Sequence, residues 1–172
     1  NFASAVRLAK SIISEPVLKE IWSIAAVDGT TPYHRAIKFN MRLAGGSSLT
    51  IRNKITPGGL PLKLSSASIS GGILYLSFNC QANPNLKFPA ELFMYFSFEK
   101  GDKLIIPLSS VIEIPSQNLK YNLEVSLGGR MKKLLIKDPH PILFIALAGG
   151  TVYKKSVYWT DTEAAVLQRD LK

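Results

Sequence analysis

The sequence predicts a mainly β protein, namely an antiparallel β-sandwich preceded by an N-terminal arm of two or three short helices. Apolar residues recur every three or four positions up to about residue 43, which is the period of a helix, and every second position from residue 49 onward, which is the period of a strand. Ten of the twelve glycines occur as Gly-Gly pairs, and four of the five pairs lie between strand-like runs. We therefore place a helical arm and linker at residues 1–46 and a β-sandwich domain at residues 47–172.

Three helices are expected in the arm, over about residues 2–14, 16–26 and 32–43. Pro16 separates the first two, because a proline suits the first turn of a helix and disfavours helical backbone at the residue before it. The third helix begins at a favourable pair, with Thr31 as N-cap and Pro32 at the first helical position. The sequence Ala-Gly-Gly-Ser-Ser that follows is typical of a linker.

Strands are expected throughout the second part of the chain. Apolar and polar residues alternate from Leu49 to Ile55, from Leu60 to Leu64 and, most regularly, from Leu119 to Leu127, which predicts strands with one buried face. Two further runs, Leu92 to Phe98 and Ile142 to Ala148, are apolar at almost every position. These two runs are expected to form central strands that are buried on both faces, with their aromatic side chains in the core.

Turn and edge signals complete the predicted domain. Gly71-Gly72 predicts a tight hairpin, and Gly149-Gly150 predicts a turn after the last apolar strand. Pro107 and Pro115 are expected at a sheet edge, where a missing N–H costs little. Residues 160–163 (Thr-Asp-Thr-Glu) match a helix capping box, which predicts a short terminal helix.

Residues able to carry catalysis or to bind a metal are few and scattered. His34 lies in the third predicted helix, His140 lies in a proline-rich turn, and Cys80 is the single cysteine. None of the three has the spacing of a metal site, and Cys80 lacks the basic neighbours of a reactive thiol. The pair Asp161 and Glu163 suits a helix N-terminus as well as it suits acid–base chemistry. We therefore expect no catalytic site, no metal, no cofactor and no small-molecule substrate.

The formal net charge of +9 is spread along the chain rather than gathered in a tail. Arg35, Lys38 and Arg42 fall on one face of the third predicted helix and are the candidate anion-binding residues. A nucleic-acid-binding module that uses this face is our alternative hypothesis, although the sequence shows no exposed aromatic residues interleaved with the basic ones and no nucleic-acid-binding signature. The apolar runs are too short to span a bilayer, so we expect no membrane insertion.

Segments at the two ends of the chain resemble known proteins. Residues 2–10 (FASAVRLAK), 16–22 (PVLKEIW) and 31–36 (TPYHRA) resemble an uncharacterised bacterial family with a helical N-terminal part and a β-sandwich C-terminal part. The strand, Gly-Gly turn and strand predicted over residues 142–158 are similar to the last hairpin of immunoglobulin- or fibronectin-like modules. The resemblance implies an immunoglobulin/fibronectin-like sandwich and implies no reaction.

The sequence favours a non-enzymatic structural or adhesive subunit that self-assembles as a homo-oligomer, for example in an extracellular fibre, a surface layer or a phage particle. The hypothesis depends on the missing catalytic groups and on the amphipathic arm, whose apolar face needs a partner. An extracellular or particle-associated location would follow from it. The candidate assembly contacts are Phe2, Val6, Ile13, Leu18 and Trp22.

Overall fold

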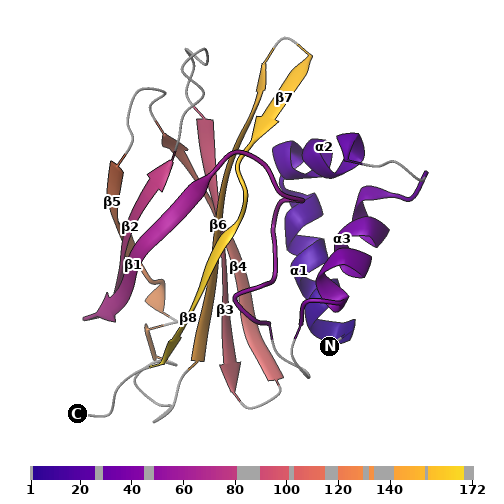
Figure 1. Cartoon of the computed structure of the whole chain (residues 1–172). Helices are drawn as coiled ribbons and strands as arrows, with labels where there is room; N and C mark the ends of the chain where they lie inside the picture. The colour runs from indigo at the N-terminus through magenta and orange to yellow at the C-terminus, as the bar shows by residue number, and fades with distance from the viewer. Residues whose placement is uncertain are drawn as a thin grey trace.

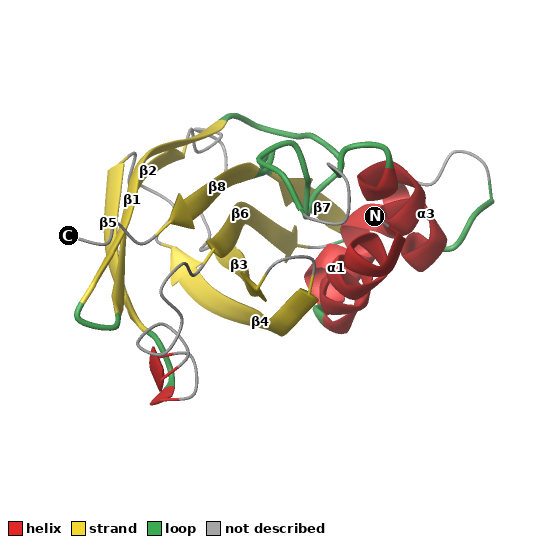
Figure 2. Ribbon diagram, turned by 90° about the horizontal axis from the view of Figure 1, so that it is seen from below, coloured by secondary structure: helices red, strands yellow, loops and turns green. Residues whose placement is uncertain are grey.

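The computed structural model describes residues 2–25, 29–44, 49–80, 90–100, 103–114, 120–129, 132–133, 142–153 and 155–168. In this part of the chain, three helices are followed by two antiparallel sheets. Figures 1 and 2 show the helices beside one of the sheets and the second sheet beyond it, so the molecule has three layers. The fold is α+β with a mainly β content.

The helical layer consists of α1 (Phe2–Ser14), α2 (Pro16–Ile24) and α3 (Pro32–Met41). Pro16 stands at the start of α2, and Glu15 before it is extended, as the steric effect of proline requires. Thr31 caps α3, because its side-chain oxygen accepts a hydrogen bond from the backbone N–H of His34. The three predicted helices are confirmed, although α2 and α3 end at residues 24 and 41 rather than at 26 and 43.

The first sheet has the strand order β1-β2-β5, and the second has the order β4-β3-β6-β7, with β8 also paired to β6. β7 pairs with residues 150–153 of β6 and β8 with residues 142–147, so these two short strands follow one another along the same edge of β6. The strands are β1 (Leu62–Ser70), β2 (Ile73–Cys80), β3 (Ala90–Lys100), β4 (Lys103–Ile114), β5 (Lys120–Ser126), β6 (Ile142–Tyr153), β7 (Ser156–Trp159) and β8 (Glu163–Gln168).

A first hydrophobic core lies between the two sheets. Strand β5 contributes Tyr121, which is buried, while its neighbours Asn122 and Glu124 are exposed, so the predicted alternation is confirmed. The rings of Tyr121 and Phe78 stack with their centroids 5.1 Å apart. The buried residues of the second sheet in this core are Leu92, Met94 and Phe96 of β3 and Leu143, Ile145 and Leu147 of β6.

A second core lies between the helices and the opposite face of the second sheet. Phe93 and Tyr95 of β3 point into it, together with Phe144, Ala146 and Ala148 of β6. The helices contribute their own apolar stripes, among which Trp22 is fully buried. Strands β3 and β6 are therefore central and buried on both faces, as predicted, because a helical layer covers the face that a two-layer sandwich would leave exposed.

Two turn and edge predictions are confirmed. Gly71 and Gly72 connect β1 to β2 with φ values of 59° and 75°, a backbone conformation that glycine adopts without steric cost. Pro107 lies in β4, which is the outer strand of its sheet. Pro115, His140 and residues 45–48 of the predicted linker lie outside the described residues, as do the side chains of Cys80 and Phe98.

The turn predicted at Gly149-Gly150 is wrong, because both glycines lie inside β6 and pair with β3. The reason is the close approach of α2. A Cβ atom on Gly150 would lie 3.0 Å from the side chain of Ile21 and 3.4 Å from that of Val17. Glycine at this position lets the helix rest on the strand, and the chain turns only after Tyr153, near Lys155 with its φ of 70°.

The strand predicted from Leu49 to Ile55 is also wrong, because this segment forms a turn and a loop. Asn53 favours the turn, since its side-chain oxygen accepts a hydrogen bond from the backbone N–H of Thr50 at 2.8 Å. Leu49 and Ile55 are buried in the second core, whereas Ile51 is exposed. The apolar alternation therefore reflects two anchoring residues on either side of a turn.

The terminal helix predicted from the capping box is wrong as well. The segment forms β8, which pairs with β6 from Leu147↔Glu163 to Ile142↔Gln168. The hydroxyl oxygen of Thr160 accepts from the backbone N–H of Gly149 at 2.8 Å, so this threonine binds the neighbouring strand. An open edge of β6 thus overrides a local helix signal.

Candidate functional site

A β-bulge separates β7 from β8 and is the most polar buried feature of the described residues. The strand pairs that flank it are Gly150↔Trp159 and Leu147↔Glu163, so the three residues 160–162 oppose the two residues 148–149. The backbone N–H of Thr160 donates to the carbonyl of Gly149 at 2.9 Å. A bulge turns side chains away from the regular alternation of a strand. Here it directs polar groups towards the loop of residues 49–60.

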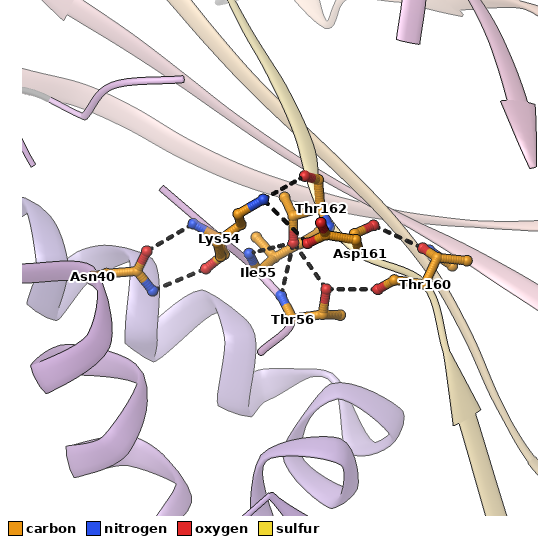
Figure 3. A network of polar contacts seen from close by, with 8 residues as sticks. Asn40, Lys54, Ile55, Thr56, Thr160, Asp161 and Thr162 are labelled. Carbon is orange, nitrogen blue, oxygen red and sulfur yellow. Dashed lines mark hydrogen bonds and ion pairs between the residues drawn. The ribbon is translucent and has the colours of Figure 1, made fainter. Parts of the chain in front are cut away.

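The hydroxyl of Thr162 is the centre of this arrangement (Figure 3). Its oxygen accepts from the backbone N–H groups of Ile55 and Thr56 at 3.0 and 2.9 Å, which uses both lone pairs. Its own proton can therefore go only to the hydroxyl oxygen of Thr56, 2.9 Å away. Thr56 in turn donates to the carbonyl oxygen of Thr160 at 2.7 Å. The geometry thus fixes the direction of each hydrogen bond that links Thr162, Thr56 and Thr160.

An ion pair flanks the bulge. The Lys54 Nζ lies 3.1 Å from Asp161 Oδ1 and also donates to the carbonyl oxygen of Thr162 at 3.1 Å. The lysine and aspartate side chains are 27% and 43% exposed, so solvent screens their attraction. Pairs of this kind contribute up to about 1 kcal/mol. Asp161 Oδ1 also accepts from the backbone N–H of Thr162 at 2.7 Å, which fixes the carboxylate on the bulge.

Asn40 extends the same network into the helical layer. Its Nδ2 donates to the carbonyls of Ala36 and Lys54 at 3.1 and 2.8 Å. Its Oδ1 accepts from the backbone N–H of Lys54 at 2.8 Å and from Asn53 Nδ2 at 3.1 Å. Both asparagines are fully buried, and the four contacts of Asn40 use its whole hydrogen-bonding capacity.

We refer to these residues as the polar clamp, because they join α3, the loop of residues 49–60 and the bulge. The clamp consists of Asn40, Asn53, Lys54, Thr56, Thr160, Asp161 and Thr162. Its hydroxyl and amide groups are engaged with one another or with the backbone. No nucleophile next to a general base occurs in it, and no cluster of metal-ligating side chains is found among the described residues. Its chemistry is that of a structural junction.

A small cavity lies beneath the junction of α1 and α2. Its volume is about 10 Å³, which is roughly the space of one water molecule and far below the size of a ligand pocket. The cavity is lined by Ser11, Ile12, Glu15, Leu18, Ile55, Phe93, Met94 and Tyr95.

No helix in the described part of the chain is long and apolar enough to cross a membrane.

The candidate assembly residues of the arm differ in how far they are exposed to solvent. Leu18 and Trp22 are 3% and 0% exposed in the second core, and Trp22 Nε1 donates to the carbonyl of Ile55 at 2.9 Å. Val6 and Ile13 are partly buried, and Phe2 is 62% exposed. The apolar face of the arm therefore packs on the chain's own sheet, and Phe2 is the member of the set that remains available to another molecule.

The candidate anion-binding residues lie together on α3, as their spacing implies. Lys38 and Arg42 are exposed, whereas Arg35 is partly buried and its guanidinium donates to the hydroxyl of Thr30 at 3.4 Å. Phe39, next to Lys38, is 39% exposed, although the sequence indicated no exposed aromatic residue among the basic ones. Elsewhere in the described residues, the adjacent basic residues Lys132 and Lys133 are also exposed.

The residues of the polar clamp were missed by sequence reasoning. Asn40 offered the clearest signal, because it is a polar residue at a position where the helical periodicity of α3 calls for a buried one. Thr160 was read as the N-cap of a helix, with Thr162 inside the same capping box, and their partners in the loop of residues 49–60 lie more than a hundred residues away in the sequence. Contacts of that range leave no local pattern.

Comparisons with known proteins assign no family to the chain. No protein-family model and no curated protein sequence matches it. Among solved structures it is similar to a crystal structure of a protein from Archaeoglobus fulgidus, with a TM-score of 0.34 and 7% sequence identity. The similarity covers 65% of this chain and 98% of that one, and at this score it carries no argument about function.

Proposed function

We propose that the chain is a non-enzymatic structural subunit that associates with further copies of itself. The polar clamp supports this, because its buried polar groups hydrogen-bond to one another and to the backbone and so join the layers. The observation that carries the proposal is the open edge of β4. Among the described residues, this strand pairs only with β3, so one side of its backbone offers unpaired N–H and C=O groups.

The β layers support an immunoglobulin- or fibronectin-like relationship, which we also propose. Fibronectin-like modules place strands A-B-E against strands C′-C-F-G. In this chain the first sheet has the order β1-β2-β5, which would correspond to A-B-E. The second sheet would correspond to C′-C-F-G if β4, β3 and β6 are C′, C and F and if the bulge divides strand G into β7 and β8. In this scheme β4 is the outer strand C′, and assembly through it would extend the sheet from one copy to the next.

Pro107 indicates which backbone groups of β4 face outward. It pairs with Ser97 of β3, and because it has no N–H to donate, it is best placed where an N–H would point away from β3. N–H groups alternate between the two sides of a strand, so the N–H of Ser109 is expected on the open side as well. Replacement of this residue by proline should remove an outward donor and leave the pairing with β3 intact.

The test measures molar mass by light scattering over a series of protein concentrations. We expect the mass of the wild-type chain to rise with concentration, and the Ser109→Pro variant to remain smaller. Ser109→Ala is the matched control, because it keeps the backbone N–H and should assemble like the wild type. Circular dichroism checks that both variants fold. A chain that stays monomeric at the highest concentration would overturn the proposal.

The alternative, a nucleic-acid-binding module, depends on Arg35, Lys38 and Arg42. It is favoured by the exposure of Lys38 on α3 and of Arg42 at its C-cap, and it is weakened by the contact of Arg35 with Thr30. Such binding would weaken steeply with salt. Duplex DNA is therefore included as a competitor in the experiment described below.

A further inference from the structure

A rigid turn projects from the C-terminal end of α3. Its backbone closes on itself, because the N–H of Asn53 donates to the carbonyl of Thr50 at 2.9 Å and the N–H of Arg52 donates to the Thr50 hydroxyl at 3.2 Å. The Thr50 hydroxyl also donates to the carbonyl of Leu43 at 2.9 Å, next to the end of α3. Asn53 belongs to the polar clamp. The tip of this turn, Ile51 and Arg52, is therefore held in place from both sides.

The tip exposes apolar surface where a folded protein usually has none. Ile51 is 63% exposed, although a turn tip normally carries small or polar residues. Met41, in the last turn of α3, is 40% exposed, and Phe2 is 62% exposed. Figure 1 shows the N-terminus at the same end of the helical layer as the end of α3. The backbone of this end of the layer therefore carries exposed large apolar residues.

Basic residues are close in sequence to Met41 and Ile51, and carboxylates are missing from the segment. Lys38, Arg42 and Arg52 are exposed, and none of them forms an ion pair within the described part of the chain. No aspartate or glutamate occurs in the sequence from Gly29 to Ala90. The exposed residues at the end of α3 and on the turn that is hydrogen-bonded to Leu43 are Lys38, Met41, Arg42, Ile51 and Arg52. We call them the α3 tip, and they combine apolar with positively charged side chains.

We infer that the α3 tip docks on an anionic lipid surface. The basic side chains complement lipid phosphates, while Ile51 and Met41 transfer apolar surface from water into the region between headgroups and acyl chains. This inference is independent of the proposed self-assembly through β4. The rigid turn adds to the affinity, because little conformational freedom is lost when Ile51 enters the lipid.

Two other partners fit the α3 tip less well. A nucleic acid would use the basic residues, but it offers no apolar environment for an aliphatic side chain such as Ile51. A second copy of the chain would bring an equally positive surface into contact with the first in a symmetric dimer, and like charges would oppose that contact. An anionic membrane surface satisfies both the charge and the apolar groups.

The test measures cosedimentation of the full chain with vesicles. We expect binding to vesicles of phosphatidylcholine mixed with phosphatidylglycerol, and none to vesicles of phosphatidylcholine alone. The double variant Arg42→Glu and Arg52→Glu should bind at least about thirtyfold more weakly, since each basic residue near the surface contributes on the order of 1 kcal/mol. Ile51→Ser should also reduce binding severalfold. The matched controls are Lys19→Glu and Ile24→Ser on α2, which remove an exposed charge and a side chain that is 50% exposed.

Fluorescence of an Ile51→Trp variant reports directly on the tip. We expect its emission to shift to shorter wavelength with anionic vesicles and to be quenched by brominated acyl chains, because the indole enters the lipid. An unchanged emission, or equal losses of binding in the control variants, would overturn the inference. Duplex DNA is added as a competitor. If DNA displaces the protein from the vesicles and the Ile51→Ser variant binds DNA as well as the wild type does, the partner of the α3 tip is a nucleic acid and the inference is overturned. Circular dichroism establishes that every variant is folded.

Discussion

Thr162 shows how much of this fold can depend on one hydroxyl group. Its oxygen accepts hydrogen bonds from the backbone N–H groups of Ile55 and Thr56, which belong to no strand, and the residue is 3% exposed. Water cannot replace the hydroxyl at such a site, so a substitution that removes it leaves both donors unsatisfied. The middle of the loop of residues 49–60 is therefore held by the side chain of a bulge residue, whereas its last residue, Leu60, is held by backbone hydrogen bonds.

The Thr162→Val variant tests this role. Valine keeps the shape of threonine and removes the oxygen, so we expect the free energy of unfolding to fall by about 3 kcal/mol. Thr162→Ser keeps the hydroxyl and loses only a methyl group, which should cost about 1 kcal/mol. Chemical denaturation measures both values. Equal losses in the two variants would contradict the role that we give to the two hydrogen bonds of the hydroxyl group.

At the scale of single residues, the sequence predicted what depends on neighbours in the chain. Thr31 caps α3 through the N–H of His34, three residues further on, and Gly71-Gly72 closes a hairpin between adjacent strands, so both predictions rest on residues close in the sequence. Asn40 and Thr162 were not predicted as site residues. Their partners are brought together only by the packing of α3 and β6, and neither residue type specifies such a contact.

At the scale of elements, the loop that enters β1 crosses the bulge at a very short distance. The backbone N–H of Leu60 donates to the carbonyl of Trp159 at 2.9 Å, and the N–H of Asp161 donates to the carbonyl of Leu60 at 2.7 Å. Gly59 makes this approach feasible. Its φ is 144°, and an added Cβ would lie 2.6 Å from both the Cδ1 and the carbonyl oxygen of Trp159.

Substitution of the neighbouring glycines separates backbone strain from steric overlap. Gly58→Ala meets no atom within 4 Å, so only its φ of 93° opposes the change, at a cost of about 1–2 kcal/mol. Gly59→Ala has a similar strain and also overlaps a backbone oxygen, so we expect a loss of about 3–5 kcal/mol. Thermal unfolding compares the two. Similar melting temperatures of the two variants would mean that the loop can move away from Trp159 without a loss of stability.

The elements that the sequence predicted wrongly share a physical cause. Gly149-Gly150 was read as a turn, but the pair gives space to α2 on the face of β6. The capping box at Thr160 was read as a helix start, but the segment is used as an edge strand. In each case the local signal was real, and a contact with a distant element decided between two uses of the same residues.

At the scale of the whole molecule, the two hydrophobic cores share their central strands. Leu92 and Met94 point to the first core, while Phe93 between them points to the second, and β6 alternates in the same way. The sequence predicted that these strands are buried on both faces, but it did not predict that the helices supply the second cover. The sequence places a boundary near residue 46, where the spacing of apolar residues changes from that of a helix to that of a strand. That this boundary separates two folding units stays a prediction.

Hydrogen exchange decides whether the helices and sheets unfold together. If the layers form one cooperative unit, the slowest amides of α1, such as that of Leu8, should exchange with the same opening free energy as those of β2, such as that of Leu76. We expect this result, because the loss of the helical layer would expose Phe93, Tyr95 and Phe144 to water, and the exposure of three aromatic side chains costs several kcal/mol, about 2 for each. A markedly lower opening free energy in α1 would instead show that the arm detaches while the sheets remain folded. That outcome would again leave an apolar helical face free to contact a neighbouring subunit, so the experiment also decides whether the arm can take part in assembly.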